Sequence, residues 1–206
     1  MKLNQILNQS ACALSVLLIG AVVAMGSIQS AQATTVIPPS FDELVSKAEL
    51  IFEGTVKNVQ SRWEGEGAMR HIQTYVTFNV HDVMKGQAQK EYTISMLGGT
   101  VDNQTMEVTD VPKFKVGNRD ILFIQNNGSQ FVPLVGIMHG RVKVVADPNQ
   151  NNAEVVATDE NVELTDIKDI GGMIAHGQKA LRKEEFKALV RANKGINEAP
   201  TGKLAN

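Results

Sequence analysis

The stretch from Asp110 to Val145 constrains the fold of this chain more than any other part of the sequence. It holds two apolar runs and a third β-rich run, which are punctuated by Gly117, Gly128, Gly136 and Gly140. Short apolar runs bounded by turn residues are typical of buried strands. We therefore expect this stretch to form the closing part of an antiparallel sheet, and we interpret that sheet as a small barrel. The stretch contains no recognisable catalytic group.

The N-terminus, residues 1–33, has the pattern of a secretory signal peptide. Lys2 precedes an apolar run from Ala11 to Met25, and the small residues of Ala31–Ala33 stand where signal peptidase requires them. A membrane span needs about 20 apolar residues, and this run is shorter. We therefore expect cleavage after Ala33, export to the periplasm or the medium, and no stable membrane anchor after cleavage.

Cysteine content and charge exclude several classes of protein. Cys12 is the only cysteine, and it would leave with the signal peptide. It precedes most of the apolar run, whereas the cysteine of a lipoprotein should follow it. The mature chain would then have no disulfide and no thiol chemistry. With 20 basic and 22 acidic residues, the sequence shows no electrostatic footprint for nucleic acid.

The first expected element of the mature chain is a short helix over Phe41–Lys47. Ser40 and Glu43 have the spacing of a capping box, in which each side chain binds a backbone amide of the first turn. The first expected strand, Leu50–Gln60, contains Gly54. A glycine inside a strand predicts a bulge or a tight bend.

The clearest strand pattern is Ile72–Val83, where apolar and polar residues alternate as in a half-buried strand. The I-L-F-I run within Asp120–Gln125 predicts burial on both faces, and Asn126–Gly128 is a hairpin signal. Further strands are expected at Glu91–Leu97, Gln104–Val108, Phe131–Val135, Arg141–Val145 and Glu154–Thr158. Two C-terminal helices are expected at Thr165–His176 and Lys183–Asn193. The domain boundaries that follow are 34–160 for the barrel, 161–195 for helices packing on it, and 196–206 for a polar tail.

The sequence offers no motif for catalysis or for a cofactor. The four histidines show no spacing typical of metal ligands, which favours solvated or hydrogen-bonded side chains; they are His71, His81, His139 and His176. Asp147–Asn151 imitates the start of a calcium loop, but Asn152 and Thr158 stand where glycine and glutamate are needed, so we interpret the segment as a turn. No nucleophile motif or phosphate-binding loop is present. We predict no catalytic residue, no cofactor and no metal.

Several short segments resemble the netrin-like domains and the tissue inhibitors of metalloproteinases. They are Ala48–Val59, Val80–Gly86 and Gly117–Phe123. The region Leu50–Val145 is also similar to uncharacterised secreted bacterial proteins that carry P-x-F-x-x-G and V-G-x-x-x-G segments, which stand here at 112–117 and 135–140. The resemblance implies a barrel of the oligonucleotide/oligosaccharide-binding type with flanking helices. The inhibitors bind zinc through an N-terminal cysteine, whereas this mature chain would begin at Thr34 and has none.

These observations favour an exported non-enzymatic binding module that engages a protein partner, such as a secreted protease, in the bacterial envelope or outside it. The candidate contact regions are the loops Ser61–Arg70 and Gly98–Gln104, at the ends of the barrel. The candidate residues within them are Trp63, Glu64, Arg70, Thr100 and Asp102. Two alternatives stay open: an exported hydrolase or metal-dependent enzyme built on His81, His139 and nearby carboxylates, and a structural envelope protein with no discrete site.

Overall fold

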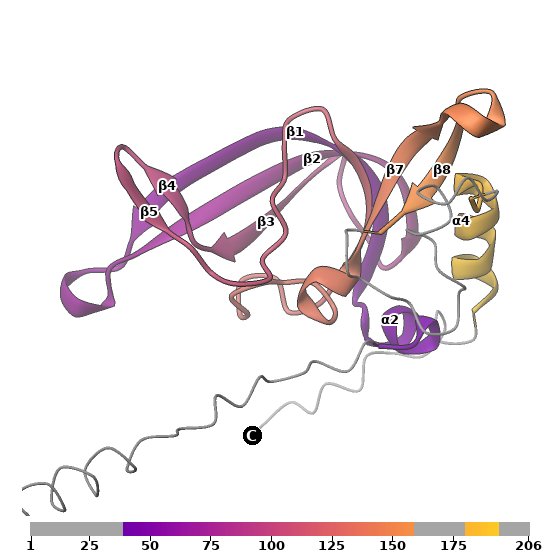
Figure 1. Cartoon of the computed structure of the whole chain (residues 1–206). Coiled ribbons are helices and arrows are strands. Elements are labelled where there is room, and N and C mark those ends of the chain that lie inside the picture. Colours follow the sequence, from indigo (N-terminus) through magenta and orange to yellow (C-terminus); the bar gives the residue numbers. More distant parts are fainter. Residues whose placement is uncertain (1–38, 159–179, 194–206) are drawn as a thin grey trace, which may run out of the picture. The chain divides into compact units, whose positions relative to one another are not determined.

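The computed structural model describes residues 39–158 and 180–193 (Figure 1). This part of the chain is mostly β: a six-stranded antiparallel sheet in the order β3-β2-β1-β6-β7-β8, with a separate hairpin of β4 and β5 and two α-helices. The elements are α2 Phe41–Lys47, β1 Leu50–Glu64, η1 Gly67–Met69, β2 His71–Lys85, β3 Glu91–Leu97, β4 Gly99–Val101, β5 Gln104–Met106, β6 Arg119–Ile124, η2 Ile137–Gly140, β7 Arg141–Asp147, η3 Pro148–Gln150, β8 Ala153–Ala157 and α4 Lys183–Ala192. The expected signal peptide, the helix at 165–176 and the polar tail lie outside the described residues.

Helix α2 begins where its capping box predicts. The backbone N–H of Glu43 donates to Oγ of Ser40, and the backbone N–H of Ser40 donates to Oε2 of Glu43, each over 3.1 Å. These two bonds satisfy amides that the first helical turn leaves without partners. The apolar face of the helix is buried, through Phe41, Leu44 and Val45.

Strands β1 and β2 form one long hairpin that determines the shape of the sheet. Their pairing is irregular beside Gly54, as the sequence predicts. The two strands approach so closely there that a Cβ atom at position 54 would lie 2.9 Å from the carbonyl oxygen of Asn79. The first part of β1, Leu50–Thr55, pairs with β6 on its second edge. Beyond that point β1 pairs with β2 alone, and β2 pairs with β3 on its other edge, so β1, β2 and β3 extend beyond β6 (Figure 1).

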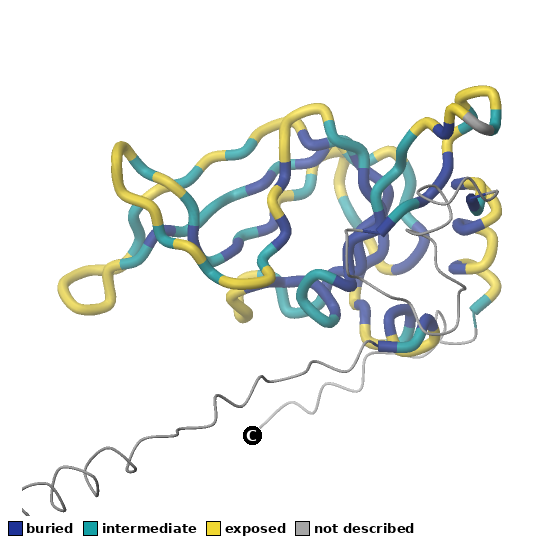
Figure 2. Tube along the Cα trace, in the orientation of Figure 1, coloured by how far each residue is buried: buried dark blue, intermediate teal, exposed yellow. Residues whose placement is uncertain are grey.

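Two hydrophobic clusters cover opposite faces of the sheet. Along β6, Ile121 and Phe123 belong to the cluster beneath α2 and α4, while Leu122 and Ile124 belong to the other cluster. Strand β6 is therefore buried on both faces, as its apolar run predicts. Figure 2 shows that the buried stretches gather toward α2 and α4, whereas the turn between β1 and β2 is exposed. The second cluster continues along β1, β2 and β3 through Phe52, Val56, Val76, Phe78, Ile94 and Met96.

The expected closed barrel is wrong for the described residues. Strands β3 and β8 are the two edges of the sheet, and the strand pairing does not join them. Loops cover these edges instead, since the N–H of Leu97 donates to the carbonyl of Phe131 (2.8 Å) and the N–H of Val156 donates to the carbonyl of Leu181 (3.0 Å). Covering an edge satisfies its backbone groups without a further strand.

The expected strand Phe131–Val135 is also wrong. This segment makes one isolated bridge, between Leu134 and Ile124, and otherwise runs as a loop. The preceding turn contributes to the cover of β3, because Oδ1 of Asn127 accepts from the N–H of Ser95 over 3.3 Å. The hairpin signal Asn126–Gly128 thus lies in a loop that covers the edge of β3, where a further strand was expected.

Candidate binding groove

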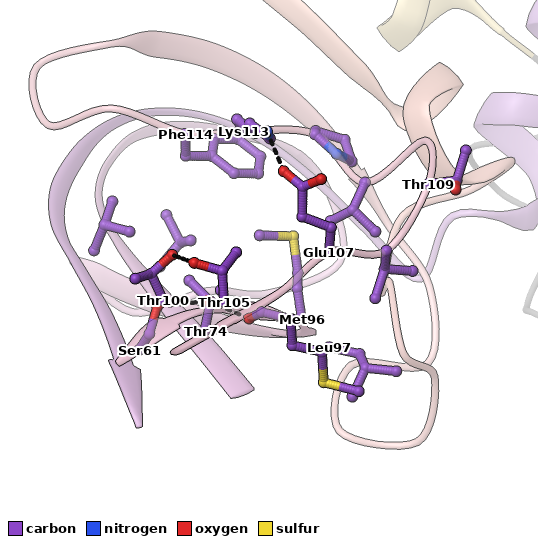
Figure 3. Close-up of a pocket in the computed structure, with 18 of the residues that line it drawn as sticks. Ser61, Thr74, Met96, Leu97, Thr100, Thr105, Glu107, Thr109, Lys113 and Phe114 are labelled. Atoms are coloured by element: carbon purple, nitrogen blue, oxygen red, sulfur yellow. Dashed lines mark hydrogen bonds and ion pairs between the residues drawn. The ribbon is translucent and has the colours of Figure 1, made fainter. Parts of the chain in front are cut away.

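A groove of about 680 Å³ lies on the face of the sheet formed by β1, β2 and β3 (Figure 3). The hairpin β4–β5 and the segment that follows it, as far as Phe114, form the other wall. The lining residues are Val59 and Ser61 of β1, Thr74 and Val76 of β2, Met96 and Leu97 of β3, and residues 98–100 and 105–114. Binding pockets in proteins commonly enclose about 300–1,000 Å³, so this groove is large enough for a ligand or for several side chains of a partner.

Two glycines allow the β4–β5 hairpin to lie close against the sheet. The N–H of Gly98 donates to the carbonyl of Ile72 over 2.8 Å. Gly99 has a φ angle of 134°, and a Cβ atom there would lie 2.2 Å from Oγ1 of Thr74 and 2.5 Å from Oγ of Ser61. A side chain at position 99 would therefore force the hairpin away from β1 and β2 and change the width of the groove.

Hydroxyl groups of the lining bond to each other or to backbone. The hydroxyl of Thr74 donates to the carbonyl of Gly98 over 2.5 Å. That hydroxyl has one proton, so Ser61 is the donor in its 2.8 Å bond to Thr74. Thr100 and Thr105 are bonded across the hairpin over 2.9 Å.

The inner lining is uncharged. Its walls combine the bonded hydroxyl groups with apolar side chains, among them the flexible Met96 and Met106. The charged residues of the lining, Glu107, Asp110 and Lys113, are exposed. Glu107 and Lys113 form a 3.5 Å ion pair with side chains 77% and 84% exposed. A largely apolar lining whose inner hydroxyls already have partners, with charge only where water reaches it, favours neutral, apolar groups.

The structure corrects the position expected for Trp63. This residue lies in strand β1, directly opposite Ile72 of β2, and the turn between the strands is confined to Gly65–Arg70. Trp63 is half-buried, and the guanidinium of Arg70 stacks on its ring at 4.3 Å. Glu64 also lies in the strand and accepts hydrogen bonds from Arg62 (2.6 Å) and from Tyr75 (2.9 Å).

The two predicted contact regions lie at the same end of the sheet. Gly99 lies so close to Ser61 that a Cβ atom on it would be 2.5 Å from Oγ of Ser61, and Ser61 is two residues from Trp63 along β1. Thr100 lines the groove, whereas Asp102 occupies the exposed turn of the hairpin with a φ angle of 52°. Among the predicted contact residues Thr100 alone belongs to the lining. Sequence reasoning missed the segment 105–114, whose role depends on its position over the sheet.

The histidines proposed for an alternative enzyme have separate partners. Nε2 of His81 lies 2.7 Å from Oγ1 of Thr55, and Nδ1 of the buried His139 lies 2.9 Å from the carbonyl oxygen of Gly136. His176 lies outside the described residues. Within residues 39–158 and 180–193, no three or more His, Cys, Asp or Glu side chains are grouped so that they could hold a metal ion.

A buried ionic cluster lies between the sheet and α4. Its centre is Glu53, which accepts a 2.7 Å hydrogen bond from Lys187 and lies 2.5 Å from Nη2 of Arg119 and 3.3 Å from Nζ of Lys183. Burial alone would raise the pKa of the Glu53 carboxyl, but the hydrogen bond from Lys187 and the three surrounding cations hold this pKa below its ordinary value. Lys187 also pairs with Asp82 over 2.6 Å. The cluster attaches α4 to the sheet.

Comparison with known proteins found no match: no family model, no curated protein and no solved structure is similar to this chain. The helices of the described residues include none that is long and apolar enough to cross a membrane.

Proposed function

We propose that this protein is an exported binding module without enzymatic activity, and that the groove over β1–β3 holds an apolar, uncharged part of a protein partner. The observation that carries the proposal is the combination of a 680 Å³ groove with a lining that is charged only at exposed positions. Burial of apolar surface in such a groove is the favourable contribution to binding. The partner belongs to the bacterial envelope or the exterior, where the N-terminal pattern directs the chain.

The groove offers little for catalysis. Among its lining residues there is no histidine, and its carboxylates, Glu107 and Asp110, are exposed. General acid–base catalysis usually depends on groups whose pKa values are tuned by burial or by close neighbours. Binding is therefore the function that this arrangement supports best.

We also infer the type of fold and a class of partner. We infer that the curved antiparallel sheet with its flanking helices is an opened relative of the barrel found in netrin-like domains. That resemblance makes a secreted protease one class of partner to test. An experimentally determined structure of this chain with its partner would show whether the strand order and the position of the groove agree with that fold.

Site-specific photo-crosslinking tests the proposed function. A photoreactive amino acid is placed at Thr105, which lines the groove, and in a matched variant at Val116, which is 65% exposed and outside the lining. Both variants of the full chain are expressed in the exporting cell and irradiated. We expect the Thr105 variant to crosslink to one partner, which mass spectrometry identifies. We expect the Val116 variant not to crosslink to that partner. Equal labelling by both positions, or no adduct at Thr105, would refute the assignment of the groove.

A further inference from the structure

One edge of strand β1 is open beside the groove. Strand β6 pairs with β1 as far as Thr55, and the backbone of Val56 continues the contact through bonds of 2.8 Å to Asn118 and 2.9 Å to Gly117. From Asn58 to Glu64, β1 pairs with β2 on one side, and no described residue forms a backbone hydrogen bond with its other side.

The backbone groups on this open edge can be assigned from the pattern of pairing. The N–H of Gly98 donates to the carbonyl of Ile72, so the backbone of Ile72 faces away from β1. The pair Trp63–Ile72 is therefore one of the non-hydrogen-bonded pairs of the β1–β2 ladder. Because such pairs alternate with hydrogen-bonded pairs, the N–H and C=O groups of Val59, Ser61 and Trp63 all point outward from the open edge.

The side chains of the same three residues lie on the groove face of β1. Val59 and Ser61 line the groove. Exposure alternates along this part of the strand, with Val59, Ser61 and Trp63 half-buried and Gln60 and Arg62 exposed. A strand added to the open edge would also present every second side chain to the groove face.

The two outer edges of the sheet are covered, in contrast to this stretch. Asn127 and Phe131 bind the backbone of β3, and Leu181 and Arg182 lie along β8. Within the described residues, Asn58–Glu64 is thus a strand edge of the six-stranded sheet whose outer side receives no backbone hydrogen bond, and it also borders the groove.

We propose that an extended segment of the protein partner adds as a strand to the open edge Asn58–Glu64 and inserts alternate side chains into the groove. This inference rests on the proposed function of the groove. A peptide backbone supplies donors and acceptors at the spacing that this edge requires, and the groove selects the side chains at alternate positions. Because the inner lining is uncharged and the hydroxyls of Ser61 and Thr74 already have partners, we expect these side chains to be apolar and to carry no charge.

A second copy of this chain fits the open edge less well than a separate peptide. Two copies paired through this edge would present Val59 and Ser61 of each copy, and these side chains already line the groove of their own subunit. Edge-to-edge pairing would leave both grooves unfilled. A free peptide has side chains available to fill the 680 Å³ space.

The first test compares Ser61→Pro with Ser61→Ala. Both variants lose the hydroxyl that bonds to Thr74, but only proline also removes the outward N–H. The Ser61 N–H does not point toward β2, so proline there leaves the β1–β2 ladder intact. The probe is a peptide selected from random ten-residue peptides displayed on phage, with protein purified from cells that express the full chain as bait. We expect S61P to bind this peptide at least about tenfold more weakly than S61A. Equal affinities, or a selection that returns no peptide, would overturn the proposal.

The second test leaves the protein unchanged. The selected peptide is N-methylated either at the alternate amides that would face β1 or at those in between. Peptides methylated at amides that face β1 should bind at least about tenfold more weakly, because they lose hydrogen-bond donors to the open edge. Of the peptides methylated at the amides in between, one should retain its affinity. In amide hydrogen exchange, Val59, Ser61 and Trp63 should exchange rapidly in the free protein and become protected when peptide is added. Protection of these amides without peptide, as a dimer of this chain would give, would contradict the proposal.

The two proposals fail in different ways. A partner that crosslinks at Thr105 but binds S61P and S61A equally supports the groove and refutes strand addition. A Thr105 variant that labels no partner refutes both proposals.

Discussion

Nζ of Lys187 in α4 lies 2.7 Å from Oε2 of Glu53 in β1, although the two residues are 134 positions apart in the chain. Glu53 is only 1% exposed, and Lys187 is 6% exposed. Burying a charge is costly unless opposite charges and hydrogen bonds compensate it. Arg119 and Lys183 surround the same carboxylate. The charge of Glu53 therefore stabilises both the sheet and the packing of α4 on it.

Replacing Glu53 with glutamine should destabilise the fold strongly. The substitution removes the charge that balances Lys183, Lys187 and Arg119, and breaking a buried ion pair costs about 3–5 kcal/mol. Urea unfolding followed by circular dichroism measures the change. Glu91→Gln is the matched control, since Glu91 pairs with Lys57 while about half exposed, and it should cost less than about 1 kcal/mol. Similar losses in both variants would contradict the role assigned to Glu53.

Stability should also depend on pH through this cluster. The pKa values of Glu53 and Asp82 are lowered in the fold: burial opposes the shift, and the hydrogen bonds from their cationic partners outweigh it. Their stabilisation is therefore present above the unfolded carboxyl pKa values, about 4, and is lost as pH falls through the lower folded values. The pKa of Lys187 is raised, against the effect of burial, by hydrogen bonds to Asp82 and Glu53. Its contribution is complete below about pH 10.4 and is lost as pH rises through the higher folded value.

The free energy of unfolding, measured with urea across the pH range, should have a broad maximum between the acid loss and the alkaline loss. In Glu53→Gln the acid-side loss should be smaller than in the unaltered protein. An acid limb of unchanged steepness would show that other carboxyl groups cause it.

The sequence predicts the elements whose signals are local. The capping box at Ser40 and Glu43 marks the start of α2, and alternation over Ile72–Val83 identifies most of β2. The expected helix Lys183–Asn193 agrees with α4 to within one residue. In each of these cases, neighbouring residues alone determine whether the apolar side chains share one face.

Features that depend on distant pairing could not be predicted from the sequence. Closure of a barrel depends on which strands meet, and here Asn127 and Phe131 occupy the edge of β3 where another strand was expected. The sequence suggests a loop at Trp63 because Gly65 and Gly67 follow nearby, but strand β1 continues as far as Glu64, and its alternating burial as far as Trp63. The segment that completes the groove, residues 105–114, carries no motif of its own.

Gly99→Ala should impair binding more than stability. The added Cβ would lie too close to Thr74 and Ser61, and the φ angle of 134° disfavours any side chain, so the β4–β5 hairpin must move. We expect a loss of binding to the selected peptide by at least about tenfold, measured by calorimetry. The control is Gly117→Ala, which also has a positive φ angle but no atom within 4 Å of the added Cβ. Unchanged binding by G99A would show that the hairpin does not set the width of the groove.

Trp63→Ala should weaken partner binding with little change in melting temperature. Trp63 lies on the groove face of the open edge, and loss of its cross-strand contact with Ile72 costs about 0.2–1 kcal/mol. Tyr75→Phe is a suitable control, because Tyr75 pairs with Gln60 on the opposite face of the hairpin. Affinity for the selected peptide and thermal unfolding are measured together. A large fall in the melting temperature would assign Trp63 to the core.

The most direct measurement for the central claim is partner affinity after the groove is filled. Val108 is half-buried in the lining, so Val108→Trp places a large side chain in the groove, while Val116→Trp adds the same side chain at an exposed position outside it. With the partner identified by crosslinking, and with circular dichroism confirming that both variants fold, we predict that V108W binds at least about tenfold more weakly than the unaltered protein and that V116W binds equally well. If V108W binds with unaltered affinity, the groove is not the binding site.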